Sequence, residues 1–257
     1  MTGILAASPG GSLCVLGAGN LNDLDVDRLL SSFAELHLVD IDPDAVRSGL
    51  ARCQLPGSDA IRLHGPVDLT GILDHLPTGI PGADAAEGLL RRLARHRCVL
   101  PGSPFGVTAS LGVLTQLLQS VVDSSLAPPD VVAVSLALRD KHLADLIHLP
   151  RPAGTVVLVT DVVSTTTAPG LRRAGPAGLE EQMAGLVAAR NFFTGTNPYR
   201  IVELLESDGR FRELVTDVRL VEPWLWPVTT DRQHLTCAIL ARRSAVPAVS
   251  HRPSGDS

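Results

Sequence analysis

The chain has 257 residues, of which 45% are hydrophobic and 19% charged, so it is too apolar for a disordered protein and has the length of one α/β domain. Its 22 basic and 27 acidic residues give a net charge of -5. This charge disfavours nucleic acid as a partner, because the chain lacks the excess of basic residues that binds a phosphate backbone. The cysteines form no Cys-x-x-Cys pair, the histidines show no metal-site spacing, and no apolar run is long enough for a bilayer. We therefore expect a soluble, cytoplasmic protein with no metal and no membrane partner.

The first predicted strand is followed at once by a glycine-rich turn. The strand covers residues 13–16, and Gly-Ala-Gly occupies residues 17–19. The spacing of leucines after the turn predicts a helix over residues 23–33, with Asn20 or Asn22 as its cap and acidic side chains in its first turn.

A second strand is predicted over residues 35–40, and it ends in an acid, Asp40. Asp42 and Pro43 then open another helix, in which Asp42 is a natural N-cap and Pro43 occupies the first turn. Residues 61–63 are interpreted as a third strand.

The middle of the chain contains a segment rich in proline and glycine. We interpret residues 77–104 as an excursion over the surface around one amphipathic helix at residues 85–96. A fourth strand follows at residues 105–110 and a helix at residues 111–122. Residues 131–148 have a helical pattern, although their valine-rich beginning also suits a strand.

The last third of the chain contains the clearest buried strand, residues 155–163, which is continuous and β-branched. Helices are predicted at residues 179–190 and 198–206, and strands at residues 218–226 and 233–242. The connection between these last strands is too short for a parallel crossover, so we expect them to pair antiparallel.

Alternating strands and helices predict an α/β fold with a doubly wound, mostly parallel seven-stranded sheet, an antiparallel C-terminal hairpin and helices on both faces. No internal repeat divides the sequence. We expect a single domain over residues 12–243, a flexible N-terminus at residues 1–11 and a flexible tail at residues 244–257.

The glycine turn and the acid after the second strand together indicate a nucleoside site. Gly17 and Gly19 let the backbone approach a ligand closely, and the Asp40 carboxylate can accept two hydrogen bonds from a ribose diol. Simpler interpretations are a tight strand-to-helix turn for the glycines and a local turn cap for Asp40.

The acids that follow the turn disfavour a phosphate-bearing ligand. Asn22 stands where a dinucleotide fingerprint has its third glycine, and Asp23, Asp25 and Asp27 crowd the predicted helix start. These carboxylates would repel a pyrophosphate. S-adenosylmethionine carries a sulfonium and an ammonium instead, and it avoids this conflict.

Five stretches of the chain resemble motifs of the class I S-adenosylmethionine-dependent methyltransferases. They read CVLGAGNLNDLDVD, LVDIDPDAV, HGPVDLTGIL, FGVTASLGVLTQLL and LPRPAGTVVLVTDVV, and the resemblance covers residues 12–243. Thr108-Ala109-Ser110 departs from the family, in which many members have an acidic residue. The resemblance implies S-adenosyl-L-methionine as cofactor and a set of contact residues: Gly17, Ala18, Gly19, Asn20, Asp40, Ile41, Asp68 and Ser110.

Several of these residues have a simpler structural interpretation. Asp68 could cap a helix that begins at Leu69 instead of contacting the adenine, and Asn20 could be a helix cap. The methyl acceptor is expected to be a small molecule or a protein, and a hydroxyl acceptor would need a general base.

His142 and Asp161 are the candidates for such a base. His142 follows charged residues in a predicted helix, and its simpler interpretation is a solvated or core-edge histidine. Asp161 and Ser164 lie at the carboxyl end of a predicted strand, where open α/β sheets bind ligands. Residues 191–198, with Phe192 and Phe193 before Thr-Gly-Thr, could fold over this edge as a lid, or the aromatic residues could be ordinary core.

Two other functions remain open from the sequence. A non-catalytic S-adenosylmethionine-binding or scaffold protein would keep the fold and the cofactor pocket without turnover. A NAD-dependent oxidoreductase shares the strand, turn and acid, but its pyrophosphate would meet Asp23 and Asp25.

Overall fold

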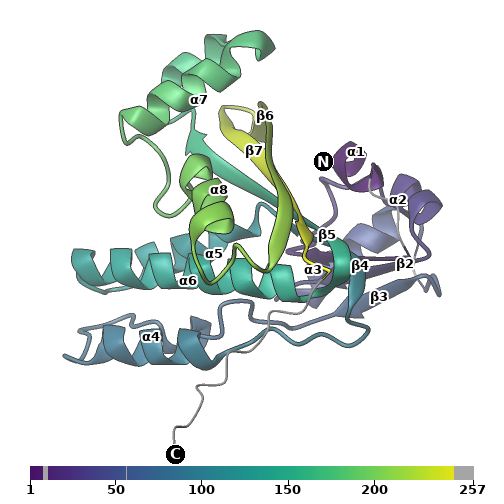
Figure 1. Ribbon diagram of the computed structural model, residues 1–257, viewed down its shortest axis with the longest axis horizontal. Coiled ribbons are helices and arrows are strands. Elements are labelled where there is room, and N and C mark those ends of the chain that lie inside the picture. Colours follow the sequence, from purple (N-terminus) through teal and green to yellow (C-terminus); the bar gives the residue numbers. More distant parts are fainter. Residues whose placement is uncertain (8–10, 56, 246–257) are drawn as a thin grey trace, which may run out of the picture.

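The computed structural model describes residues 1–7, 11–55 and 57–245. Its centre is one seven-stranded sheet with the strand order β3-β2-β1-β4-β5-β7-β6 (Figure 1). Strands β1 to β5 are parallel to one another, and β7 runs antiparallel to both β5 and β6. This arrangement confirms the predicted fold class. The strands are β1 (Ser12–Leu16), β2 (Glu35–Val39), β3 (Ile61–His64), β4 (Phe105–Leu111), β5 (Pro150–Ser164), β6 (Val215–Thr229) and β7 (Arg232–Arg243).

Helices cover both faces of this sheet, as expected. Three of them, α1, α2 and α3, pack on one face, and α4, α5, α6 and α8 pack on the other, while α7 stands beyond the end of β5 (Figure 1). The α-helices are α1 (Thr2–Ala6), α2 (Val26–Ser32), α3 (Pro43–Arg52), α4 (Ala85–Arg95), α5 (Val113–Val122), α6 (Pro128–His148), α7 (Leu179–Ala188) and α8 (Pro198–Ser207). Short 3-10 turns are η1 (Leu73–His75), η2 (Pro169–Arg173) and η3 (Pro176–Gly178).

The side-chain alternation of β1 shows how the sheet separates two cores. Leu13 and Val15 point into the core under α1, α2 and α3, whereas Cys14 and Leu16 point into the core under α5 and α6. All four are fully buried. A strand buried on both faces reads as a continuous apolar run, and this is why LCVL was recognisable as a strand.

Helix caps fix where the chain turns away from the carboxyl edge of the sheet. The Asp42 carboxylate accepts the backbone N–H groups of Asp44 at 3.0 Å and Ala45 at 3.1 Å, so Asp42 is the N-cap of α3 as predicted. Helix α2 begins at Val26, later than predicted, because Asp25 accepts the Arg28 N–H at 3.0 Å. Neither Asn20 nor Asn22 caps it.

The valine-rich segment at residues 131–138 is helical, within α6, which confirms the predicted helix. Two other segments differ from the expectations. Strand β5 begins at Pro150, before the predicted strand. The first residues form α1, whose Leu5 is fully buried, and the Thr2 hydroxyl accepts the Asp25 N–H at 3.0 Å.

Two further sequence expectations concern the chain's tail and membranes. Most of the tail predicted at residues 244–257 lies outside the described residues. None of the described helices combines the length and the apolar character that a bilayer crossing requires.

Candidate functional site

A cavity of about 170 Å³ lies at the carboxyl edge of the sheet, between the segments that follow β1, β2 and β3 and the start of α5. It contains four of the residues expected at a cofactor site: Gly17, Asp40, Ile41 and Asp68. The rest of its lining is formed by Val67, Leu69, Thr70, Leu73, Val113, Gln116, Leu117 and Ser120.

Gly17 brings the first turn against α5, where no side chain fits. Its φ is +74°, and an added Cβ would lie 2.5 Å from the Cβ of Val113. Real Cβ atoms do not approach so closely, and this backbone conformation favours glycine. Glycine is therefore required at position 17 by the close packing against α5, and Gly17 also lines the cavity.

The Asp40 carboxylate ties the glycine turn to the end of β2. Its Oδ2 accepts the Gly19 N–H at 2.7 Å, and its Oδ1 accepts the Asp42 N–H at 2.9 Å. A carboxylate has about four lone-pair sites, so each oxygen keeps capacity for another donor. Because Asp40 also lines the cavity, it can accept hydrogen bonds from a diol placed there.

Ile41 contributes an apolar side chain to the wall of the cavity. Its side chain is 48% exposed, which is unusual for an isoleucine, and Leu69 and Leu117 extend the apolar lining. A flat apolar ligand would cover this surface.

Asp68 organises the segment after β3. Its carboxylate accepts the Thr70 N–H at 2.7 Å, the Thr70 hydroxyl at 2.6 Å and the Leu73 N–H at 3.1 Å. Burial raises the pKa of Asp68, but these hydrogen bonds outweigh it and hold the pKa below its ordinary value. No helix begins at Leu69, so Asp68 is not the helix cap that the sequence suggested; it fixes its own loop beside the cavity.

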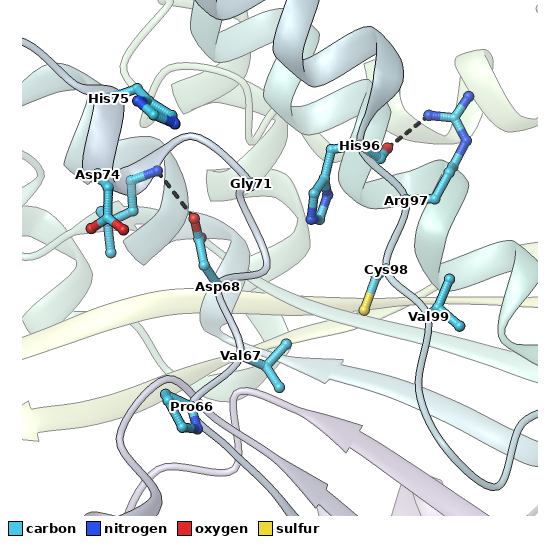
Figure 2. A pocket seen from close by; sticks show the side chains of 11 residues that line it. Pro66, Val67, Asp68, Gly71, Asp74, His75, His96, Arg97, Cys98 and Val99 are labelled. Carbon is cyan, nitrogen blue, oxygen red and sulfur yellow. Dashed lines mark hydrogen bonds between the residues drawn. The ribbon is translucent and has the colours of Figure 1, made fainter.

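A second cavity, of about 420 Å³, lies on the other side of this loop (Figure 2). In Figure 2 Asp68 stands on one side of it, and His96 and Cys98 stand on the other. Burial lowers the pKa of His96 and raises that of the Cys98 thiol to about 11, so both are neutral at pH 7. Among the described residues, no group of three or more His, Cys, Asp or Glu side chains is placed to hold a metal ion.

Ser110 and His142 do not line the first cavity. The Ser110 hydroxyl lies 2.8 Å from Nε2 of His142, and both residues are almost fully buried between β4 and α6. Ser110 turns into the core because β4 is buried on both faces. Ser110 is therefore bonded within the protein core, which corrects its expected contact with a cofactor, and the burial of His142 favours the core interpretation of this histidine over a base that faces an acceptor.

This buried histidine makes stability depend on pH. Burial, with a smaller contribution from the Lys141 charge, lowers the pKa of His142 from 6.5 to about 4. Between pH 6.5 and about pH 4, the His142 side chain is protonated in the unfolded chain and neutral in the folded chain. The free energy of unfolding should therefore decrease as the pH is lowered through this interval. Urea unfolding above and within the interval measures the slope. His142→Gln should flatten it, and an unchanged slope in that variant would contradict the assignment.

A buried ion pair anchors α6 to the loop of Asp68. Nζ of Lys141 lies 2.8 Å from Oδ2 of Asp145, and both side chains are 3% exposed. Lys141 also donates to the carbonyl of Leu69, and Asp145 accepts the Cys98 N–H at 3.2 Å. The pair therefore holds both segments that flank the second cavity.

Asp161 lies farther along the same edge, on β5. Its Oδ1 accepts the Thr236 hydroxyl at 2.8 Å, and its Oδ2 lies 2.9 Å from Nδ1 of His234. Both partners are on β7, and His234 was not singled out by the sequence. The signal was absent because only the antiparallel register joins these distant positions.

Residues 191–198 also lie at the carboxyl edge. The Phe193 N–H donates to Val162 at 2.8 Å, and Gly195 stands against Leu118 of α5. Phe192 packs with the apolar cluster around Met183, which fits the core interpretation for that side chain. Movement of this segment as a lid stays a prediction.

The cavity residues of α5 were missed by the sequence analysis. Val113, Gln116, Leu117 and Ser120 follow helical spacing and form one face. Gln116 and Ser120 are polar positions one turn apart in this helix, and this pair was the available signal.

Comparison with known proteins gives a likeness in structure only. No protein-family model matches the chain, and no curated protein matches it in sequence. The structure is similar to the YcgJ protein of Bacillus subtilis, with 9% identity, a TM-score of 0.51 and coverage of 96% of this chain and 98% of that one. A SAM-dependent methyltransferase of Methanosarcina mazei aligns at 10% identity and TM-score 0.49, covering 96% and 99%.

The N-methyltransferase NodS of Bradyrhizobium japonicum, solved with S-adenosyl-L-homocysteine, aligns at 13% identity and TM-score 0.45, covering 93% of this chain and 81% of that one. At these identities the likeness concerns the fold alone. The TM-score of 0.51 shows that the chain and the YcgJ protein share their fold.

Proposed function

We propose that the chain binds S-adenosyl-L-methionine and transfers its methyl group to a small-molecule or protein acceptor. The observation that carries the proposal is the cavity in which Gly17, Asp40, Ile41 and Asp68 meet. A close backbone turn, a carboxylate with free lone pairs and an exposed apolar side chain are what a nucleoside without phosphates needs.

In this proposal each side of the cavity holds one part of the nucleoside. Asp40 accepts the ribose hydroxyls, and Ile41 and Leu69 contact the adenine beside Asp68. Since the cavity is smaller than the roughly 300 Å³ at the lower end of small-molecule sites, we assign to it the adenosine end alone. Gly19 and Asn20 continue along the edge toward the methionine end. Ala18 packs its methyl group into the core and contributes main-chain atoms only.

The start of α2 supports this cofactor over a dinucleotide. A pyrophosphate needs free N–H groups at a helix N-terminus. Here residues 20–25 separate the glycine turn from α2, Asp25 occupies the Arg28 N–H, and Asp27 adds charge to the first turn. These contacts at the start of α2 therefore disfavour a NAD-dependent oxidoreductase.

The chain's own part in the reaction is alignment. The sulfonium supplies an activated methyl group when the cofactor is bound, so the protein has to hold the acceptor in line with it and exclude water. Binding at Gly17 and Asp40 fixes the adenosine end, and the acceptor lies on the edge toward β4 and β5.

S-adenosylhomocysteine should raise the melting temperature of the chain, whereas NAD should leave it unchanged. A ligand at one hundred times its Kd stabilises the folded state by about 2.7 kcal/mol, which for a chain of this size is roughly 5–10 °C. Differential scanning fluorimetry with both ligands measures the effect. A shift with NAD alone would favour the NAD-dependent oxidoreductase over the methyltransferase. Binding without turnover on any acceptor would favour the scaffold function.

A further inference from the structure

A third cavity, of about 500 Å³, lies between helix α4 and the loop of Asp68. This arginine cavity is lined by Gly71, Gly88, Arg91, Arg92, Arg95 and His96. Gly71 and His96 also line the second cavity, so the two cavities adjoin (Figure 2). In a chain with a net charge of -5, three arginines around one cavity are a local concentration of positive charge.

The cavity residues that come from α4 share one face of the helix. They follow the spacing i, i+3, i+4 and i+7, at Gly88, Arg91, Arg92 and Arg95. Leu89 and Leu93 are buried on another face, in the core. Side chains three or four residues apart have Cβ atoms about 5–6 Å apart, so Arg95 and the arginines one turn before it can reach the same small ligand.

Two of the three arginines have no acid of their own. Arg91 pairs with Glu87, one turn earlier. Within the residues that the structure describes, the exposed side chains of Arg92 and Arg95 make no ion pair. Like charges at this spacing repel one another, and the helix dipole offsets part of the repulsion because both arginines are in the last turn. Their positive charge is open to an anion.

Gly88 has no packing reason to be glycine. It lies inside α4, where glycine is less favourable than alanine. An added Cβ would meet nothing within 4 Å, so no neighbouring group requires the missing side chain. The glycine instead keeps the cavity open beside the arginines. A residue that weakens its helix without a packing reason is expected at a functional site.

Gly71 fixes the wall that the arginine cavity shares with the second cavity. Its φ is +68°, and an added Cβ would collide with the His96 ring. Nδ1 of His96 is buried and has no hydrogen-bond partner in the described part of the chain. Nε2 is therefore the nitrogen of this ring that can reach a ligand.

A phosphate monoester fits the arginines better than a carboxylate does. It carries a charge of about -2 near pH 7 and has three strong acceptor oxygens. One guanidinium already matches both oxygens of a carboxylate, whereas three on one helix face can donate to all the oxygens of a phosphate. NAD contains no phosphate monoester, so the expected absence of a NAD effect is unchanged.

The surroundings of the arginines favour a compact ligand. Asp68 and Asp74 line the adjoining second cavity, so a long polyanion would extend from the arginines onto negative charge. Each of the two cavities exceeds the roughly 300 Å³ at the lower end of small-molecule sites. Asp74 and His75 can hydrogen-bond hydroxyl groups in the second cavity.

We propose that the arginine cavity binds the phosphate monoester of a small molecule, and that the hydroxyl-bearing part of this molecule lies in the second cavity. The proposal goes beyond the methyl transfer proposed above and does not rest on it. Arg92 and Arg95 hold the phosphate, Arg91 adds charge, and Gly88 leaves the room.

The test is isothermal titration calorimetry of the full chain at low salt with ribose 5-phosphate, inorganic phosphate and citrate. We expect saturable binding of ribose 5-phosphate with a Kd of about 1 mM or tighter, and weaker binding of the other two anions. The double variant Arg92→Gln with Arg95→Gln should lower the affinity by about tenfold or more, because the charge-assisted hydrogen bonds to the phosphate are lost.

Two further variants separate a shaped site from general charge. Arg28→Gln with Arg151→Gln removes the same charge from exposed positions that line neither cavity, and the affinity should stay within about twofold at moderate salt. Gly88→Leu keeps every charge and improves the helix, but its side chain occupies the cavity. This variant should bind about tenfold more weakly, and its melting temperature without ligand should be at least that of the native chain.

The outcomes decide each part of the proposal. No saturable binding of either phosphate, or equal losses in the two arginine double variants, overturns the site. Normal affinity in Gly88→Leu overturns its location, and tighter binding of citrate overturns the phosphate. Tighter binding of inorganic phosphate would assign the site to free phosphate, and tighter binding of a short RNA would overturn the small ligand. S-adenosylhomocysteine is titrated separately, and its failure to bind would overturn only the methyl transfer.

Discussion

Replacing Asp40 with alanine is expected to lower the affinity for S-adenosylhomocysteine by roughly tenfold to a thousandfold, because two charge-assisted hydrogen bonds to the ribose are lost. The structure adds a second cause. The variant also frees the Gly19 and Asp42 N–H groups that the carboxylate accepts, so the glycine turn loses its tie to β2. Isothermal titration calorimetry measures the affinity.

Asp42→Ala is the matched control, since it removes a carboxylate two residues away. It should destabilise the fold by about 1 kcal/mol through the lost N-cap of α3 and leave the affinity nearly unchanged. Loss of binding in Asp42→Ala with normal binding in Asp40→Ala would mean that the two acids have been assigned the wrong way round.

Lys141→Met is expected to produce the largest loss of stability, about 3–5 kcal/mol, because it leaves a buried carboxylate without its counter-charge. Asp145 is 3% exposed, and Lys141 is also the donor to the carbonyl of Leu69. Urea unfolding near neutral pH gives the free-energy change.

The double variant Lys141→Met with Asp145→Leu provides the control, because an apolar pair of similar volume often replaces a buried ion pair at little cost. It should unfold at a higher urea concentration than Lys141→Met alone. Equal midpoints for the single and the double variant would show that the two charges are not coupled.

The sheet and a third of the residues lining the cavity were predictable because their signals are local. Residues 13–16 and 155–163 are apolar on both faces, as strands at the centre of a parallel sheet are. Gly17 lies in a turn where its φ is positive, and Asp40 follows the end of a strand, so each is marked by its own chain segment. Asp42 likewise follows from cap chemistry alone.

The orientation of Ser110 and the pairing of His234 could not be predicted because they depend on long-range packing. Strand β4 is buried on both faces, so the pattern around Ser110 does not say which side chains face the core under α6. His234 meets Asp161 only through the β5–β7 register, which a bulge shifts between Asp161 and Val163. The start of α2 was missed because Asp25 is one of several acids that could have capped it.

The buried Lys141 has a practical consequence for chemical labelling. It is the only lysine in the chain, and its side chain is 3% exposed. Amine-reactive esters should therefore modify no lysine on the native surface. Any acylation of Lys141 would require local opening of α6 from the loop of Asp68. The rate of that single modification, followed by mass spectrometry, would report how often the wall between the two cavities opens.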